Sequence, residues 1–115
     1  MSTYELLRSA IRGRYQVFAT YEGHVRAMCP HVLGLKRRRQ HCLFYQFGGT
    51  SESAGLMVPG SSDNWRCLDI ALLHDVTLRV GPWFTADNHV RPSRCIDEVD
   101  VEVDRFFVGS MGMVR

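Results

Sequence analysis

The longest unbroken run of charge in the chain consists of Lys36, Arg37, Arg38 and Arg39, and Gln40 alone separates it from the apolar run "HCLFYQF". An apolar run of this kind is typical of a strand that is buried on both faces. A loop between two strands is normally solvated, so the first interpretation of the cations is the tip of a hairpin. The second is a contact with phosphates, because a cation that neutralises a phosphate releases a counterion. The two interpretations are compatible, since a solvated tip is also where a long polyanion would be met.

Two further arginines interrupt apolar stretches: Arg26 in "HVRAMC" and Arg66 in "WRCLDI". Either each points outward as an ordinary surface residue, or both face one groove as paired donors for a phosphate or carboxylate. In the second case Tyr45 and Trp65 would offer flat faces on which bases could stack. Each stacked base would contribute about 1–3 kcal/mol of binding free energy. The alternative is that these two rings belong to the core. Basic groups interleaved with aromatic rings are typical of single-strand binding.

Enzyme chemistry finds little support in the sequence. Cys29-x-His31 and the adjacent pair His41-Cys42 come nearest to metal-ligand spacing, and neither matches a zinc pattern. Three of the four cysteines lie in apolar runs, where a nucleophilic thiolate is disfavoured. The stretch "GGTSES" lacks the lysine of a phosphate-binding loop. We therefore expect a protein that is not an enzyme and that uses no metal and no cofactor.

Length and composition predict one domain with a sizeable core, since the chain has 115 residues of which 45% are hydrophobic. A net charge of +2 is too small to establish a nucleic-acid partner. Lys36 is the only lysine, and arginine suits phosphates and carboxylates, although codon usage in a GC-rich genome explains the bias equally well. The cysteines show no C-x-x-C motif and no apolar run approaches a membrane span of about 20 residues. We expect reduced thiols, a cytoplasmic location and no membrane partner.

The pattern of apolar residues predicts one helix followed by five or six short strands. The helix spans residues 2–13, with a capping box from Ser2 to Glu5, an apolar face including Leu7 and Ile11, and a stop at Gly13. The expected strands cover residues 15–21, 24–35 with an end, edge or bulge at Pro30, 41–47, 65–73, 75–80 after a turn at His74-Asp75, and 96–103. Residues 48–64 read as a long Gly/Ser-rich loop, and the alternating acids of 96–103 indicate a half-solvated edge strand. So short a sheet is most stable when curled, which predicts a mainly β fold with an N-terminal helix, a small Sm/SH3-like barrel.

The order of the segments "AIRGR", "FATYEG", "VRAMCPHVLGL", "CLFYQFGGTSES" and "NWRCLDIALL" resembles the WYL domain family, here as a stand-alone domain. The resemblance covers about residues 6–80 of a single domain spanning 1–115, and residues 81–115 form a C-terminal extension with an edge strand. The tripeptide that names the family would fall on His41-Cys42-Leu43, where only the leucine matches.

The resemblance implies a bacterial ligand-sensing or regulatory module, linked to transcription regulation or phage defence, that acts on a regulatory partner protein. Its basic groove would bind a nucleotide-like or single-stranded nucleic-acid ligand. The family places pocket-lining polar groups at the positions of Tyr21, Arg26, His31 and Arg66. The alternative is a structural module that forms a homodimer through the acidic strand 96–103 and binds no small ligand.

Overall fold

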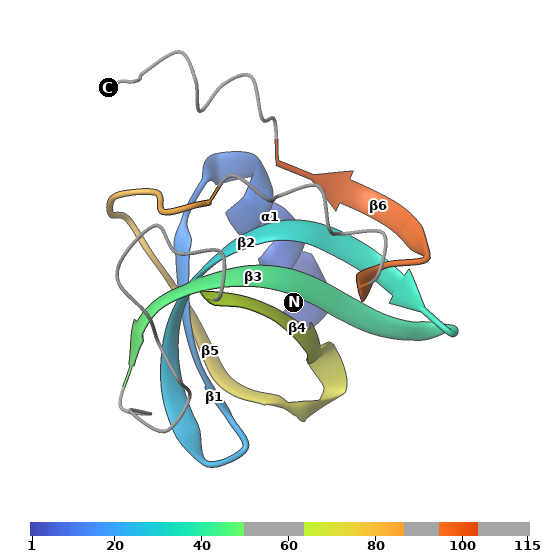
Figure 1. Ribbon diagram of the computed structural model, residues 1–115, viewed down its shortest axis with the longest axis horizontal. Helices are drawn as coiled ribbons and strands as arrows, with labels where there is room; N and C mark the ends of the chain where they lie inside the picture. The colour runs from blue at the N-terminus through green and yellow to red at the C-terminus, as the bar shows by residue number, and fades with distance from the viewer. Residues whose placement is uncertain (50–63, 87–94, 104–115) are drawn as a thin grey trace.

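The computed structural model describes residues 1–49, 64–86 and 95–103, which form one helix and a strongly curved antiparallel sheet (Figure 1). The elements are α1 (Thr3–Gly13), β1 (Gln16–Tyr21), β2 (His24–Lys36), β3 (Arg39–Gly49), β4 (Trp65–Asp69), the 3-10 helix η3 (Ile70–Leu72), β5 (Leu73–Arg79) and β6 (Glu98–Glu102). The strand order is β4-β3-β2-β1-β5, and β6 pairs with β2. The predicted fold class, mainly β with an N-terminal helix in a small Sm/SH3-like barrel, is confirmed.

Helix α1 begins as the sequence predicts and ends one residue later. The Ser2 side chain accepts a hydrogen bond from the backbone N–H of Glu5, whose carboxylate accepts one from the backbone of Ser2. The helix ends at Arg14, which adopts the left-handed conformation with φ 55°, whereas Gly13 is still helical. A Cβ on Gly13 would lie 2.4 Å from the ring of Tyr15, so the glycine is required for this close packing.

The connection between β4 and β5 differs from the expected turn at His74-Asp75. The chain reverses through η3, which Asp69 caps by accepting a hydrogen bond from the N–H of Ala71. His74 and Asp75 lie within β5, where Asp75 has φ 54° and the pairing with β1 shifts register. Aspartate tolerates the left-handed conformation, so it occupies a bulge as readily as a turn.

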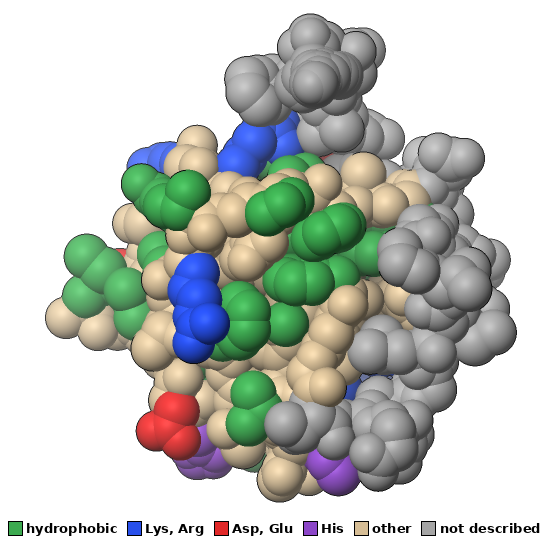
Figure 2. All heavy atoms as spheres, turned by 90° about the vertical axis from the view of Figure 1, so that its left-hand side faces the viewer, with side chains coloured by type: hydrophobic (Ala, Val, Ile, Leu, Met, Phe, Trp, Pro, Cys, Tyr) green, Lys and Arg blue, Asp and Glu red, His purple; other side chains and the backbone are tan. Residues whose placement is uncertain are grey.

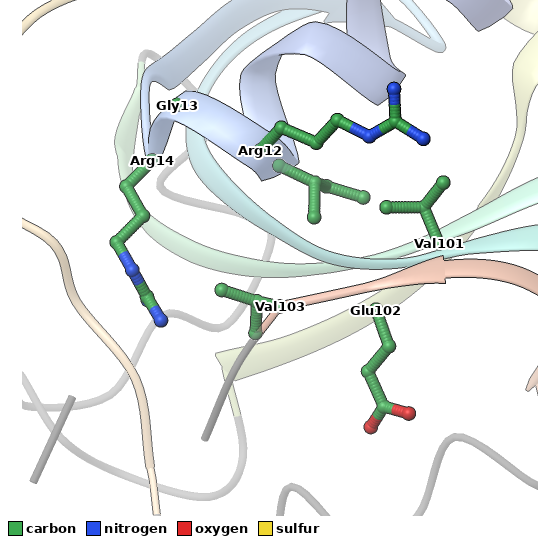
Figure 3. Close-up of a pocket in the computed structure, with 7 residues that line it drawn as sticks. Arg12, Gly13, Arg14, Val101, Glu102 and Val103 are labelled. Atoms are coloured by element: carbon green, nitrogen blue, oxygen red, sulfur yellow. The ribbon is translucent and has the colours of Figure 1, made fainter. Parts of the chain in front are cut away.

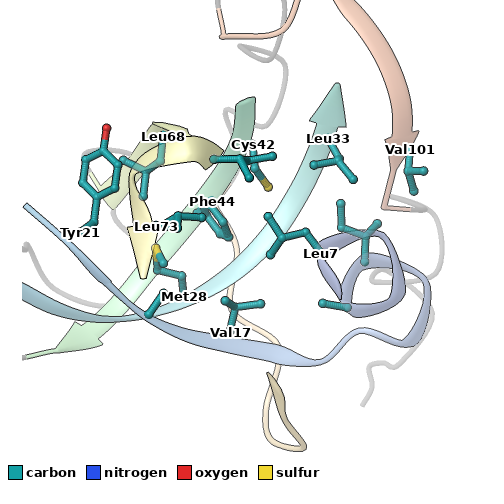
Figure 4. Close-up of a cluster of buried hydrophobic side chains, with 14 of the residues drawn as sticks. Leu7, Val17, Tyr21, Met28, Leu33, Cys42, Phe44, Leu68, Leu73 and Val101 are labelled. Atoms are coloured by element: carbon teal, nitrogen blue, oxygen red, sulfur yellow. The ribbon is translucent and has the colours of Figure 1, made fainter. Parts of the chain in front are cut away.

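The main core lies on the concave side of the sheet, between the strands and α1 (Figure 4). Leu7, Ala10 and Ile11 of α1 are buried there against residues that alternate along the strands: Val17, Ala19, Tyr21, Met28, Leu33, Cys42, Phe44, Leu68, Leu73 and Val101. In Figure 4, Tyr21 lies at the end of this core away from the helix. A second, smaller cluster of Val32, Leu43, Cys95 and Ile96 packs with Trp65.

Strand β6 is an edge strand, as predicted, but its valines do not share one face. Val101 is buried, whereas Val99 is 54% exposed. The reason is a register shift: Leu33 pairs with Val101 and Gly34 with Val99, so Asp100 has no partner in β2. Asp100 instead accepts hydrogen bonds from Tyr4 Oη and Arg8 Nη2 of α1, both at 2.7 Å. One acid of the expected solvated face therefore joins β6 to the helix.

Gly34 allows β6 to approach β2. A Cβ at this position would lie 2.0 Å from the carbonyl oxygen of Glu98 and 2.7 Å from Cγ2 of Ile96. Gly34→Ala should lower the free energy of unfolding by about 1–3 kcal/mol, as overpacking does elsewhere. Gly48→Ala is the matched control, because its Cβ would meet only Ala27 at an ordinary 3.6 Å. Urea denaturation compares the two, and equal stabilities would contradict the proposed role of Gly34.

The Asp100 contacts predict acid sensitivity. Hydrogen bonds from Arg8 and then Tyr4 hold the pKa of Asp100 below its usual 3.8, and burial followed by the bond to Asp100 raises the pKa of Tyr4 to about 12. A lowered carboxyl pKa adds stability above 3.8 that is lost as the pH falls through the folded-state value. Asp100→Asn should therefore lose less stability on acidification than the wild type does. Thermal melts across acid pH test this, and the control is Glu98→Gln, a change on the same strand that leaves the bonds of Asp100 to Tyr4 and Arg8 in place.

Candidate functional site

Arg26 is a buried cation at the end of the barrel away from α1, and its side chain is only 8% exposed. It pairs in register with Ala19 of the core, so it faces the inside of the sheet. Its Nη1 donates to Oε1 of Gln46 at 3.1 Å and its Nε to the carbonyl of Tyr21 at 3.4 Å. The guanidinium carbon also lies 5.3 Å from the centre of the Tyr21 ring. Tyr21 and Arg26 are thus brought together.

The charge of Arg26 has weak compensation within the described residues. The carboxylate of Glu22 is 3.8 Å away, and the Glu22 side chain is 69% exposed. Gln46, the neutral partner, is fully buried and donates its own amide to the carbonyl of Gly48. A buried cation is costly unless it is paired, so this guanidinium favours an anion within reach. Gln46 was not among the expected site residues, although a lone amide inside "CLFYQF" is a signal for such a partner.

Arg66 lies on the same face of the sheet as Arg26 but further along it. Arg66 pairs with Phe44 of β3, whereas Arg26 pairs with Gly49, five positions away. At about 3.3 Å per residue this separation along β3 is roughly 16 Å. Nη1 of Arg66 donates to the carbonyl of Trp65 at 3.0 Å. The two arginines share a face, but Arg26 donates to Gln46 and Tyr21 whereas Arg66 donates to Trp65.

His31 lies on the opposite face, so the structure does not bring it to Tyr21 and Arg26. It has no partner in β3, because Pro30 pairs with Phe44 and Val32 with Leu43. The ring is 1% exposed, and its Nδ1–H donates to the carbonyl of Cys29 at 2.9 Å, which leaves Nε2 to accept from the Thr85 hydroxyl at 3.0 Å. The imidazole is a buried, hydrogen-bonded group.

Tyr45 and Trp65 also face this outer side and pack with His31. The centres of the His31 and Trp65 rings are 4.8 Å apart, and those of Tyr45 and Trp65 are 5.2 Å apart. Tyr45 is fully buried, so a base cannot stack on it in this structure. Trp65 is partly exposed. Tyr45 is therefore an aromatic residue of the core, which is the alternative to base stacking.

The four cations Lys36 to Arg39 form the tip of the β2–β3 hairpin. Arg37 and Arg38, the two turn residues, both have left-handed backbones, with φ 51° and 69°. Arg39 Nε donates to the Asp69 carboxylate at 3.0 Å, and the backbone N–H of Arg37 donates to Asp97 at 2.9 Å. The side chains of Arg37 and Arg38 are exposed and form no ion pair with any described residue.

A shallow cavity of about 350 Å³ lies between the end of α1 and β6 (Figure 3). Val101 and Val103 face the helix end there, and Figure 3 shows the Glu102 carboxylate pointing away from Arg12 and Arg14. None of the expected site residues lines this cavity.

The cysteines divide into one disulfide and two buried thiols. Cys67 of β4 and Cys95 are joined, with their Cα atoms 5.6 Å apart. The expectation of reduced thiols is therefore wrong for this pair and holds for Cys29 and Cys42. Burial raises the pKa of Cys29 to about 12 and raises that of Cys42 well above its usual value. Neither thiol is suited to act as a nucleophile at neutral pH.

The disulfide predicts a measurable stabilisation. It links residues 28 positions apart, and loop-closure entropy gives roughly 3–4 kcal/mol for a loop of this length. Reduction, or Cys67→Ser, should lower the free energy of unfolding by about that amount. In denaturant without reductant, alkylation should label Cys29 and Cys42 alone. Labelling of all four cysteines would contradict the bond.

Within residues 1–49, 64–86 and 95–103, no group of three or more His, Cys, Asp or Glu side chains is arranged to hold a metal ion. In that same part of the chain, no helix has the length and apolar character needed to cross a bilayer. No protein-family model, no curated protein and no solved structure matches this chain. The candidate site therefore stands on its own geometry: a cationic hairpin tip and a buried arginine on the inner face of the sheet.

Proposed function

We propose that the chain is a non-enzymatic module of WYL type that binds a nucleotide-like or single-stranded nucleic-acid ligand through its arginines. Binding would alter how the module engages a regulatory partner protein, in transcription regulation or phage defence. The observation that carries the proposal is the identity of the two residues at the hairpin turn, Arg37 and Arg38.

Two left-handed residues in a two-residue hairpin turn define the geometry for which Asn-Gly is strongly preferred. A residue other than glycine held in this region costs on the order of 1–3 kcal/mol. Arg37 and Arg38 are therefore energetically unfavourable in the turn they form. A contribution to the stability of the fold does not explain why arginine occupies these two positions. Exposed guanidinium groups without protein partners are what a phosphate contact requires.

Arg26 adds a second positive site to the proposal. Among the described residues its buried charge has two neutral hydrogen-bond partners and one exposed carboxylate, that of Glu22 at 3.8 Å. A phosphate or carboxylate at this end of the barrel would supply the missing charge. Arg66 on the same face would extend the contact along β3.

The decisive variant is Arg37→Asn/Arg38→Gly, which should stabilise the fold and weaken binding together. Removing two phosphate contacts should lower affinity for a labelled single-stranded oligonucleotide roughly tenfold near physiological salt. It should also reduce the salt slope of log K by about 1.4, since each contact on a single strand contributes about 0.7. Fluorescence anisotropy at several salt concentrations measures binding, and urea denaturation measures stability.

The control is Arg12→Gln, which removes an exposed positive charge at the end of α1, far along the chain from the hairpin. It should leave the affinity near that of the wild type. An oligonucleotide that binds the hairpin variant as tightly as the wild type would overturn the assignment of the hairpin. A wild-type protein that binds no oligonucleotide or nucleotide would overturn the proposed function itself.

The alternative function is a homodimerising module that uses β6. The exposed Val99 on an edge strand is the observation that favours it, because such an edge offers unpaired backbone groups to a second copy. Sedimentation distinguishes the two functions: Glu98→Lys/Glu102→Lys should change the oligomeric state only if β6 forms the dimer.

A further inference from the structure

Three phenylalanine rings form a row on the convex face of the sheet, the side away from α1. The centres of Phe18 and Phe47 are 6.2 Å apart, and those of Phe47 and Phe84 are 4.6 Å apart. All three side chains are partly exposed. Figure 2, which looks at the side where β1 and β5 lie, shows hydrophobic side chains gathered on this face with a basic side chain against them. We call Phe18, Phe47 and Phe84 the ring row.

The backbone holds these rings in place. Phe47 has no partner in β2, because Ala27 pairs with Gly48 and Met28 with Gln46, and such a bulge redirects the side chain. The backbone N–H of Phe84 donates to the thiol sulfur of Cys29 at 3.3 Å. Rings fixed by the backbone lose little freedom when a ligand packs on them.

The same segment is fastened to the sheet on either side of Phe84. Nε2 of Gln16 donates to the carbonyl of Pro82 at 2.7 Å, and the Thr85 hydroxyl bonds to the buried ring of His31. A Cβ on Gly81 would lie 2.7 Å from the Gln16 side chain, so the segment lies close against β1. Phe84 is thereby presented on the surface by a well-anchored stretch of chain.

A guanidinium group lies at one end of the ring row. Arg79 sits 4.1 Å above the centre of Phe18, is exposed and has no ion pair with any described residue. A guanidinium stacked on a ring can still present its N–H edge to an anion. The Phe18 end of the ring row thus carries a positive charge.

We infer that the ring row is a stacking surface for the unpaired bases of a single-stranded nucleic acid, with Arg79 on its phosphates. The inference rests on the proposed nucleic-acid ligand and adds a contact surface that the hairpin does not supply. Proteins that bind single strands without sequence specificity combine aromatic rings with basic residues, because every base has a flat face that can stack on a ring. Bases paired in a duplex present no free face, so the ligand would be single-stranded DNA or RNA.

The test uses two probes, a labelled single-stranded oligonucleotide of DNA or RNA and an inorganic polyphosphate of similar charge. Phe18→Leu/Phe47→Leu keeps apolar bulk and removes two flat rings. It should weaken oligonucleotide binding about tenfold or more, the effect expected from lost base stacking, and leave polyphosphate binding unchanged. The hairpin variant Arg37→Asn/Arg38→Gly should weaken both probes. Tyr15→Leu, an equivalent change to a partly exposed ring outside the row, should weaken neither.

A second measurement needs no change within the row. Trp65→Phe leaves Trp83 as the only tryptophan, next to Phe84 in the chain. Its emission should be quenched saturably by the oligonucleotide and left unchanged by polyphosphate.

The outcomes separate this inference from the proposed function. Oligonucleotide binding that is equal in the wild type and in Phe18→Leu/Phe47→Leu, with no quenching of Trp83, overturns the inference and leaves the hairpin contact standing. A loss of self-association in the same variant, seen by sedimentation without any change in oligonucleotide binding, also overturns it and identifies a protein interface. A wild-type chain that binds neither probe overturns both.

Discussion

Residues without a pairing partner determine the curvature of this sheet and the side on which each important side chain lies. His31 in β2, Phe47 in β3 and Asp100 in β6 each have no partner where the register shifts, and β5 has a similar shift at Asp75. A bulge bends its strand and increases the local twist. Four of them in so short a sheet allow the strands to curl around the core and leave α1 to cover it.

The same irregularities assign the unpaired side chains to their contacts. His31 turns to the convex face and packs between Trp65 and Trp83, with ring centres 4.8 and 5.0 Å away. Phe47 turns outward between two other phenylalanines. Asp100 reaches α1 and leaves Val99 exposed. One set of backbone shifts therefore fastens the helix, buries a histidine and exposes a row of rings.

Local patterns in the sequence predicted most of the fold. The capping box at Ser2, the alternation of β1 and the apolar run of β3 each depend on residues a few positions apart, and the structure has all three. Positions that depend on register were not predictable in this way. Counting alternate residues fails beyond a bulge: Val99 and Val101 are two positions apart, yet the unpaired Asp100 between them leaves Val99 exposed and Val101 buried.

Contacts between distant segments were also missed. Cys67 and Cys95 meet because of the order of the strands. Cys67 lies in β4, which pairs with β3, and β3 pairs with β2. Cys95 precedes β6, which also pairs with β2. The rings expected to stack on bases in a groove with Arg26 and Arg66 are Tyr45 and Trp65. The structure instead places Arg79 and Phe18, 61 positions apart, in contact across the β1–β5 pairing.

Strands β2 and β3 connect the two proposed contact surfaces, the tip of the β2–β3 hairpin and the ring row. The hairpin cations lie at one end of β3, and Phe47 lies near the other, eight residues after Arg39. At about 3.3 Å per residue the two are at most roughly 26 Å apart along the strand. Stacked nucleotides rise about 3.4 Å each, so a continuous strand would need about eight nucleotides to reach both. A mononucleotide would contact only one of them, so the presence of both surfaces on one ribbon favours an oligonucleotide over a small nucleotide as the ligand.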